Sequence, residues 1–434
     1  MSPNHGRIAI IGGGYAGMSA AVELCLLGRQ VTVFEAGQTL GGRARRVVID
    51  GKTLDNGLHI LIGAYRQTLQ MIDTVAGTAS DAGLMRLPLQ LIAPGHSELR
   101  TATLPAPLNV LAGLITANGL CVRDKLGIAR MMLRLRLTRY TLEHDYPVSR
   151  LLQNHSQTES ATRLLWNPLC LAALNTSPES ASAQTFLNVL RDTFAAPARN
   201  SDLLLPTLDF SRLFPDRAAD FVRRHDGTVQ IGTRVQGVRP NKQGVLVELS
   251  EDSQHFSASI IAVAPQHLSA LIRDVPELSP LLAQVAEFDY NPIYSIYLGY
   301  PAEVRLARPM LGLHGGLGQW VFDRGQLGDA PGSLGVVISA PGVHQDMALD
   351  ALAFAVHQEL KNMLGKLPDP HWHQVIAEKR ATYACVAGLV RPAARTPASG
   401  IYLAGDYVQS GYPATLEAAV RSGITAAHLA AKTA

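Results

Sequence analysis

The chain has 434 residues, which exceeds the usual length of one domain and predicts two closely associated domains. Hydrophobic residues make up 47% of it and charged residues 17%, and the mean hydropathy is +0.10, as in a globular protein with a slightly apolar surface. A formal net charge of +3 is too small to favour a nucleic-acid-binding protein.

Cysteine usage and apolar runs narrow the class further. Cys25, Cys121, Cys170 and Cys385 are far apart and form no CxxC pair, so we expect no metal site and a reducing compartment. No apolar run reaches the roughly 18 residues that a spanning helix needs without Pro, Asn or charge. We therefore expect a cytoplasmic protein, with peripheral contact at the inner membrane as an option.

The first predicted elements are a strand over 7–11, a glycine-rich turn and a helix over 16–27. Gly12, Gly14 and Gly17 form G-x-G-x-x-G directly after the strand. The first glycine permits a tight turn, the second lets the backbone approach a pyrophosphate, and the third lets helix and strand pack closely. The amides at the start of the helix then point at that pyrophosphate.

The next predicted strand, "VTVFE", ends in an acidic residue. Glu35 follows Gly17 by 18 residues, where a carboxylate accepts a hydrogen bond from a ribose hydroxyl and repels a 2′-phosphate. Strand, glycines, helix, strand and acid occur in order, so the segment predicts FAD or NAD and disfavours NADP.

The following stretch, "EAGQTLGGRARRVVIDGKTLDNGLHIL", contains a GGR element. It resembles the flavin-containing amine oxidase and phytoene desaturase superfamily, which implies FAD. The resemblance also implies an α/β fold, with a discontinuous Rossmann-like FAD-binding domain and an α+β substrate domain. It places Arg43 and the backbone of Gly42 along the pyrophosphate or flavin. Arg45 either shares this role or is a solvated loop cation.

The C-terminal "GIYLAGDYVQSGYPATLEAAVRSG" predicts a strand, a loop and a helix that begins near Thr415. The superfamily ends in the same way, which implies that Asp406, after Gly405, contacts the ribityl–pyrophosphate region. Thr415 would cap the helix, and its amides, with that of Leu416, would face the cofactor.

The middle of the chain supplies the third part of the cofactor site. The segment 226–238, "DGTVQIGTRVQGV", resembles the family segment in which a valine backbone holds the adenine, which implies Val235. The strand "ASIIAVAP" would return to the nucleotide-binding sheet. No second G-x-G-x-x-G follows a strand, so we expect no NADPH domain.

These segments define a domain plan. The FAD-binding domain would comprise residues 1–80, 205–265 and 395–434, and the substrate-binding region residues 81–204 and 266–394.

The sequence predicts both helices and strands in the substrate-binding region. Its first block is mainly helical, with the clearest helix in "DKLGIARMMLRLRLTRYTLEHDYPV". Residues 123–150 hold seven basic and three acidic residues, which suits an anionic membrane surface or a solvated face. The second block has strand-like alternation in "NPIYSIYLGY" and "LGVVISAPG", consistent with a sheet beneath a substrate cavity.

Five segments narrow the resemblance: "KTLDNGLHILIGAYRQTL", "LLWNPLCLAALNTSPESASAQTFLNVLRD", "SDLLLP", "NPIYSIYL" and "GYPATLEAAVRSG". Together they are similar to the hydroxysqualene dehydroxylase family of squalene and hopanoid biosynthesis. This implies an apolar C30 isoprenoid substrate, hydride from N5 of reduced flavin to an allylic carbon, and protonation of the leaving hydroxyl. The chain departs from the family pattern at Leu58, where Gln is common.

The acid for the leaving hydroxyl has several candidates. His59 follows "LDNG", where the family chain turns beneath the flavin, and is either the acid or a core histidine. Tyr412 and Tyr15 flank the two flavin loops and either donate a proton or pack. Asn167 and Asn175 either orient the hydroxyl or, for Asn175, cap a helix.

The residues expected to contact FAD are Gly12, Gly14, Tyr15, Ala16, Gly17, Glu35, Ala36, Gly42, Arg43, Gly57, Leu58, His59, Val235, Gly405, Asp406, Thr415 and Leu416. Alternative activities are carotenoid or phytoene desaturation, amine oxidation, and non-catalytic escort of a prenyl lipid. The sequence leaves the oligomeric state open.

Overall fold

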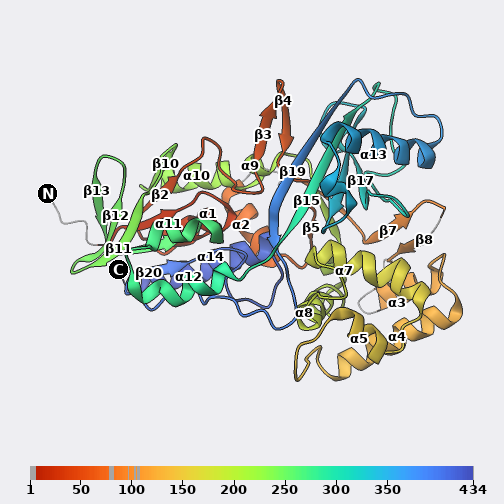
Figure 1. Cartoon of the computed structure of the whole chain (residues 1–434), viewed down its shortest axis with the longest axis horizontal. Helices are drawn as coiled ribbons and strands as arrows, with labels where there is room; N and C mark the ends of the chain where they lie inside the picture. The colour runs from red at the N-terminus through yellow and green to blue at the C-terminus, as the bar shows by residue number, and fades with distance from the viewer. Residues whose placement is uncertain (1–5, 78–82, 96, 102–103, 105–107, 434) are drawn as a thin grey trace.

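The computed structural model describes residues 6–77, 83–95, 97–101, 104 and 108–433. The outermost residues of the predicted segments 1–80 and 395–434, and part of 81–204, therefore lie outside the described residues. The molecule is elongated, with a parallel sheet towards one end and an antiparallel sheet above a group of helices towards the other (Figure 1).

The parallel sheet has five strands in the order β10-β2-β1-β14-β20. Its two central strands are buried on both faces, which explains their nearly all-apolar sequences. The strands come from all three segments predicted for the FAD-binding domain, so the prediction of a discontinuous Rossmann-like fold is confirmed. The bounds are β1 Ile8–Ile11, β2 Val31–Glu35, β10 Thr228–Ile231, β14 Ala258–Ile261 and β20 Ile401–Leu403.

Four helices pack around this sheet: α1 Tyr15–Leu26, α2 Arg66–Ala76, α10 Pro215–Arg224 and α14 Leu416–Ala431. Helix α1 contacts both α10 and α14. Small residues make its crossing with α14 close, since a Cβ added to Gly423 would lie 2.2 Å from the Ala16 carbonyl oxygen. The predicted helix over 16–27 matches α1 to within one residue.

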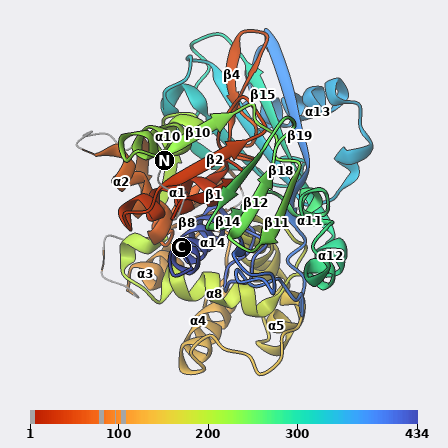
Figure 2. The same ribbon diagram turned by 90° about the vertical axis from the view of Figure 1, so that its left-hand side faces the viewer.

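A small antiparallel sheet and two helices adjoin the parallel sheet. The sheet has the order β11-β12-β13, with bounds Gly237–Asn241, Gly244–Glu248 and Ser253–Phe256. Helix α11 (Leu268–Ile272) contacts β11, and α12 (Ser279–Ala286) lies next to α11 in Figure 2. These helices therefore sit on the cofactor side, although the sequence plan assigned them to the substrate-binding region.

The second large sheet is antiparallel, in the order β16-β17-β18-β15-β19. Its two longest strands, β15 and β19, run from helix α13 (Leu349–Leu364) back towards the parallel sheet (Figure 1). The predicted strands in "NPIYSIYLGY" and "LGVVISAPG" are β15 and β18. The bounds are β15 Tyr290–Gly299, β16 Met310–Gly312, β17 Trp320–Asp323, β18 Ser333–Ser339 and β19 Trp372–Tyr383.

The helical block lies at the lower edge of the molecule in two perpendicular views (Figures 1 and 2). Its longest helix ends earlier than predicted, because Arg139 and Tyr140 adopt positive φ of 52° and 58°. A π-helical turn over Thr162–Trp166 precedes α7, where Pro168 lacks an N–H for regular α-helical bonding. The bounds are α3 Leu108–Thr116, α4 Val122–Leu137, α5 Val148–Asn154, α6 Glu159–Ala161, α7 Asn167–Leu174 and α8 Ala183–Phe194.

Shorter elements connect these parts. They are the hairpin of β3 Arg46–Ile49 and β4 Lys52–Asp55, the sheet of β5 Leu61–Ile62, β9 Leu203–Pro206 and β6 Leu84–Leu87, the hairpin of β7 Gln90–Ala93 and β8 Ser97–Arg100, and helix α9 Phe210–Leu213. In the described part of the chain, no helix combines the length and apolar character needed to cross a bilayer.

Candidate active site

A cavity of about 710 Å³ extends from the carboxyl ends of the parallel strands to the antiparallel sheet. This volume falls in the range of small-molecule and cofactor sites. Of the residues that the sequence predicted for FAD, all but Gly17 line it. The prediction therefore converges on one cavity, although its residues come from opposite ends of the chain.

The glycines form a cradle of bare backbone at one end of this cavity. Gly12 has a φ of +110°, and a Cβ there would lie 2.6 Å from the Ala262 carbonyl oxygen. Gly14 lies against Gly42, since a Cβ on Gly42 would be 3.3 Å from the Gly14 Cα. The cradle sits at the N-terminus of α1, where free amides favour an anion. These residues fit a pyrophosphate.

Gly17 has a packing role. A Cβ there would lie 1.9 Å from the Gly12 carbonyl oxygen, so only glycine lets α1 approach the turn after β1. This agrees with the close helix–strand packing expected of the third glycine in the motif.

Glu35 is held at the tip of β2. Its carboxylate accepts hydrogen bonds from the amides of Gly13 and Gly37, each at 2.7 Å. Ala36 and Val235 line the same end of the cavity. The carboxylate is thus fixed where the motif places the ribose hydroxyl acceptor.

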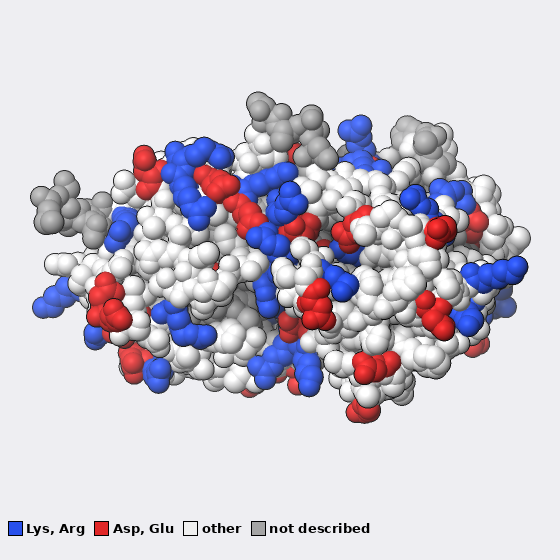
Figure 3. All heavy atoms as spheres, turned by 90° about the horizontal axis from the view of Figure 1, so that it is seen from above, with Lys and Arg blue, Asp and Glu red and all other residues white. Residues whose placement is uncertain are grey.

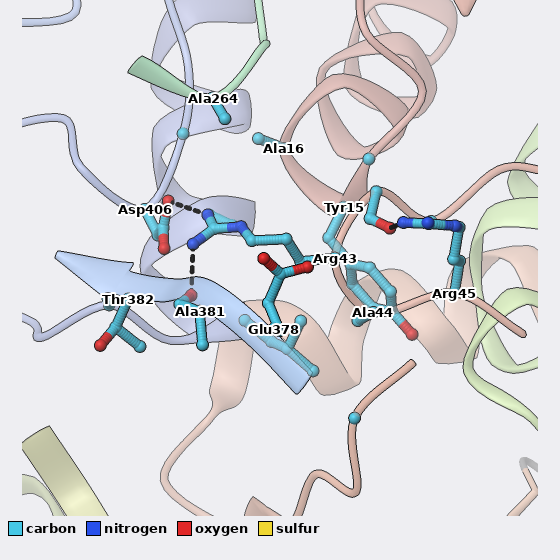
Figure 4. A pocket seen from close by; sticks show the side chains of 18 of the residues that line it. Tyr15, Ala16, Arg43, Ala44, Arg45, Ala264, Glu378, Ala381, Thr382 and Asp406 are labelled. Atoms are coloured by element: carbon cyan, nitrogen blue, oxygen red, sulfur yellow. Dashed lines mark hydrogen bonds and ion pairs between the residues drawn. The ribbon is translucent and has the colours of Figure 1, made fainter. Parts of the chain in front are cut away.

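Arg43 and Asp406 meet in the middle of the cavity. The Arg43 Nη2 donates to Asp406 Oδ1 at 2.6 Å, and Nη1 donates to the Ala381 carbonyl on β19 (Figure 4). Burial alone would lower the pKa of the guanidinium, but the charge and hydrogen bond of Asp406 outweigh it and raise the pKa. The arginine is therefore a fixed cation beside the glycine cradle.

Three more predicted residues complete this region. Arg45 donates to the Gly42 carbonyl at 2.7 Å, which holds the GGR turn. The Thr415 hydroxyl accepts from the Ala418 amide at 3.2 Å and caps α14, as predicted. Leu416 is the first residue of α14, whose N-terminus opens into the cavity.

His59 lines the cavity and packs edge-on against Phe210, with ring centroids 5.1 Å apart. Burial, and then the charge of Arg43, lower the pKa of His59 to about 4. The imidazole is therefore neutral near pH 7. It can donate a hydrogen bond, but it does not hold the extra proton of a general acid.

Leu58, in the position where the family commonly has Gln, faces the antiparallel sheet. Its side chain covers Gly335, where a Cβ would lie 2.6 Å from Leu58 Cδ1. Its amide donates to the Ser295 hydroxyl at 3.2 Å. The substitution therefore adds apolar surface to the cavity.

The two candidate tyrosines have structural partners. Tyr15 lines the cavity, and its hydroxyl donates to the Phe210 carbonyl at 2.9 Å. Tyr412 does not line it: its hydroxyl donates to Asp192, and the Arg421 guanidinium lies 4.2 Å from its ring centroid. The geometry gives no support to a catalytic role for Tyr412, because its hydroxyl is engaged away from the cavity.

Of the two roles that the sequence offered for Asn175, the structure shows helix capping. Asn175 lines the cavity, but its φ of 47° marks it as the left-handed cap of α7. Its amide donates to Thr382 Oγ1 at 2.9 Å and accepts from the Ala340 amide at 2.7 Å, so it is committed to structure. Asn167 does not line this cavity.

Strand β19 brings in residues that the sequence did not single out. Glu378, Ala381 and Thr382 all line the cavity, and the Glu378 carboxylate lies close to Arg43 in Figure 4. Asn56 Nδ2 donates to Glu378 at 3.3 Å. The run "AEKRATY" has no glycine pattern that would indicate a cofactor site. Its position at the cavity follows only from the pairing of β19 with β15.

Part of the cavity wall is apolar. It comes from the antiparallel sheet, from the end of α7 and from the segment after β4, and the residues are Leu58, Ala172, Ala173, Leu174, Ile293, Trp320, Phe322 and Val337. The same elements also contribute the polar residues Asn175, Ser339, Glu378 and Thr382. The alternation of the predicted strands indicated such a wall, but not which residues face it.

Comparisons with known proteins agree with this site. The family described as flavin containing amine oxidoreductase matches residues 15–430. Hydroxysqualene dehydroxylase from Rhodopseudomonas palustris is 28% identical, over 97% of each chain. Zeta-carotene desaturase from Synechocystis is 24% identical, over 97% of this chain and 96% of that one. A putative protoporphyrinogen oxidase from Exiguobacterium has a similar fold, with a TM-score of 0.71 at 16% identity over 99% of each chain.

The family match covers nearly the whole chain and includes Glu35, Arg43 and Asp406 of this cavity. The cofactor is FAD. The glycine cradle, Glu35 and Arg43 line a cavity whose shape and charge fit it, and they are the groups that would hold it. The chain belongs to the flavin-containing amine oxidoreductase family.

Proposed function

We propose that this oxidoreductase is a hydroxysqualene dehydroxylase, which reduces hydroxysqualene to squalene in squalene and hopanoid biosynthesis. The observation that carries the proposal is the apolar part of the cavity wall, to which the antiparallel sheet contributes Ile293, Trp320, Phe322 and Val337. Such a wall suits a hydrocarbon chain and offers few groups for a polar substrate. Similarity to hydroxysqualene dehydroxylase over the full length supports the same substrate class.

Replacement of a C–O bond by a C–H bond consumes one hydride and one proton and releases water. Fully reduced FAD, when bound, would supply both the hydride and the proton, and it would thereby become oxidised FAD. The protein must hold the allylic alcohol and keep bulk water away. In the proposal, Trp320, Phe322 and Val337 line the path of the hydrocarbon and exclude water.

In the proposal, His59 binds the hydroxyl group of the substrate that leaves in the reaction. It lines the cavity and follows the turn that the family places beneath the flavin. Because its pKa is lowered to about 4, it acts as a neutral hydrogen-bond donor to the departing oxygen rather than as an imidazolium. Burial is the main cause of this lowered pKa, and the positive charge of Arg43 adds to it because it disfavours a second cation nearby.

Carotenoid-type desaturation is the second candidate, because a zeta-carotene desaturase is also similar over the full length. An apolar cavity beside FAD serves either direction of electron flow.

An anaerobic experiment separates the two. We expect photoreduced enzyme to be reoxidised by hydroxysqualene, with squalene as the product by mass spectrometry. Oxidised enzyme mixed with phytoene or zeta-carotene should stay oxidised. Reduction of the flavin by either carotenoid, with hydroxysqualene inert, would overturn the proposal, and reduction by putrescine alone would favour amine oxidation.

A further inference from the structure

Helix α4 presents an apolar stripe to solvent. Its residues Val122, Leu126, Leu133 and Leu137 are 73%, 66%, 61% and 76% exposed. At 3.6 residues per turn, they fall within about 60° of the helix circumference. Ile115 of the neighbouring helix α3 adds a fifth side chain, 64% exposed. Exposed apolar patches of this kind mark interaction sites on soluble proteins.

The stripe lies opposite the face that α4 buries. Ile128, Met131 and Leu135 point into the core and are at most 4% exposed. The buried face therefore already satisfies the packing of the helix. The stripe is additional, and nothing in the described part of the chain covers it.

Arginines border the stripe on both sides. By helical position, Arg130 and Arg134 lie along one edge and Arg136 along the other, and all three are exposed. No carboxylate of the described residues forms an ion pair with them. The acidic residue of α4, Asp124, is buried, where it accepts from the Cys121 amide at 2.8 Å and from the Thr158 hydroxyl.

The charge of this face differs from that of another face of the molecule. In Figure 3, seen from the side away from α4, acidic and basic side chains are interspersed. The exposed charges of α4 are all positive. An apolar stripe with positive borders matches an anionic lipid surface, where apolar side chains enter the acyl region and arginines meet the headgroups.

A second cavity, of about 260 Å³, lies beside the stripe. Leu133 belongs both to the stripe and to the wall of this cavity, and Arg136, which borders the stripe, also lines the cavity. The remaining walls are almost wholly apolar. They come from β7, β8, α3, α4, the π-helical turn, α7 and the end of α8, and from residues next to β7, α4 and α8. They are Leu89, Leu91, Leu99, Leu114, Ile128, Ala129, Met132, Tyr140, Leu165, Trp166, Leu169, Phe194 and Ala195.

We infer that α3 and α4 dock the enzyme on an anionic lipid bilayer, with the stripe inserted among the lipids and the second cavity opening towards them. A second copy of this chain is a poorer fit for the stripe. Two copies that met through their stripes would bring the arginines of one α4 against those of the other, and α4 itself has no exposed carboxylate to offset them.

The second cavity also adjoins the core that walls the active site. One apolar cluster contains Leu89 of the second cavity together with Phe322 and Val337 of the first. Phe194, which also lines the second cavity, packs against this cluster. An apolar chain that leaves the bilayer at α4 would meet this cluster on its way to the flavin. This use of the cavity rests on the proposed function, whereas the docking does not.

The test uses the FAD-loaded full chain and vesicles of phosphatidylglycerol and phosphatidylethanolamine, with pure phosphatidylcholine vesicles as the neutral comparison. We expect co-sedimentation with the anionic vesicles that falls with salt. The double variant Leu126→Gln/Leu137→Gln should weaken it by about tenfold or more, because two exposed leucines are removed from the lipid. The matched control Leu349→Gln/Phe354→Gln changes exposed apolar residues of α13 and should bind as wild type does.

A second pair of variants tests the charges. Arg130→Gln/Arg134→Gln should weaken binding to anionic vesicles and flatten its salt dependence, while the control Arg223→Gln/Arg224→Gln on α10 should not. Equal binding by the wild type and the Leu126/Leu137 variant, or no binding by the wild type, would overturn the inference. So would a wild-type dimer in light scattering that the same variant dissociates.

The two proposals fail separately. Flavin reoxidation by hydroxysqualene in detergent micelles reports the reaction without a bilayer, and the Leu126/Leu137 variant should retain it. If the Leu126/Leu137 variant loses vesicle binding and keeps flavin reoxidation, the result supports docking through the stripe. Vesicle binding by an enzyme that never turns over hydroxysqualene would refute the proposed function and leave the docking standing.

Discussion

Arg43 and Asp406 are 363 residues apart in sequence, yet their side chains form an ion pair of 2.6 Å within the FAD cavity. The pair joins the loop after β2 to the loop after β20 and so ties the first and last segments of the cofactor-binding sheet together. It also fixes the direction of the guanidinium, whose other nitrogen bonds to the Ala381 carbonyl of the antiparallel sheet.

Removal of this guanidinium should weaken FAD binding. Arg43→Ala takes away a cation beside the glycine cradle and leaves the carboxylate of Asp406 unpaired there. A hydrogen bond to a charged group contributes about 1.5–3 kcal/mol, so we expect the Kd for FAD to rise by one to two orders of magnitude. Titration of apoprotein with FAD, followed by fluorescence, measures this.

Arg46→Gln is the matched control for that variant. Arg46 pairs with Asp216 and does not line the cavity, so its Kd should stay within a factor of about two of wild type. An unchanged Kd in Arg43→Ala would show that the arginine serves the fold and not the cofactor.

Loss of the His59 imidazole should slow turnover while FAD stays bound. A neutral hydrogen bond contributes about 0.5–1.5 kcal/mol, so His59→Ala should lose on the order of tenfold in the rate of flavin reoxidation by hydroxysqualene. His59→Gln retains a donor and should lose less. Tyr412→Phe should keep the wild-type rate, since that hydroxyl bonds to Asp192 outside the cavity.

The dependence of the flavin reoxidation rate on pH provides a second test of His59. Because its pKa is lowered to about 4, it should produce no inflection near 6.5 in the wild-type profile. An inflection near 6.5 that His59→Gln abolishes would show that the residue works as an acid in its imidazolium form.

Asp55 should make stability depend on pH. Burial raises the pKa of this carboxyl to about 6, although Arg324 and the Phe210 amide oppose the shift. Between pH 4 and 6 the folded protein therefore binds more protons here than the unfolded chain, and this contribution to stability is lost as pH rises through 6. Asparagine has no proton to lose in this pH range, so Asp55→Asn does not undergo this loss of stability.

The free energy of unfolding of Asp55→Asn should accordingly rise relative to wild type between pH 4 and 7, by up to about 3 kcal/mol. The asparagine oxygen can still accept from the Phe210 amide, which now bonds Asp55 at 2.9 Å. Denaturant unfolding at a series of pH values measures the difference. A constant difference across the series would mean that Asp55 titrates normally.

The third glycine of the motif should tolerate no side chain. Gly17→Ala places a Cβ 1.9 Å from the Gly12 carbonyl oxygen, and backbone there cannot move without shifting α1 from the sheet. We expect a loss of roughly 1–3 kcal/mol in stability together with reduced FAD content. Thermal unfolding and the flavin-to-protein absorbance ratio measure both.

Gly127→Ala makes the opposite change at an open position in α4. Its new Cβ would have Gln157 Nε2 as nearest neighbour, at 3.8 Å, and alanine favours a helix over glycine by about 1 kcal/mol. The melting temperature should rise in this variant. A similar fall in both variants would show that the contact at Gly17 is not the cause.

Local sequence patterns were enough to predict many of the residues that line the candidate cofactor site. The glycines, Glu35 and α1 were predictable because a phosphate-binding turn needs contiguous residues with special backbone freedom, and this requirement is visible in sequence. Arg43, Val235 and Asp406 were predicted by family resemblance, and all three line the cavity. The central buried strands were predictable because burial on both faces leaves an apolar run.

Only the tertiary structure decided the properties that depend on distant neighbours. The neutral state of His59 follows from burial and from Arg43, and the engagement of Tyr412 follows from Asp192, on another helix. Glu378 and Thr382 reach the cavity through strand pairing that no local pattern encodes. The basic helix was visible in the sequence, but which of its faces stays apolar and exposed was decided by what packs beneath it.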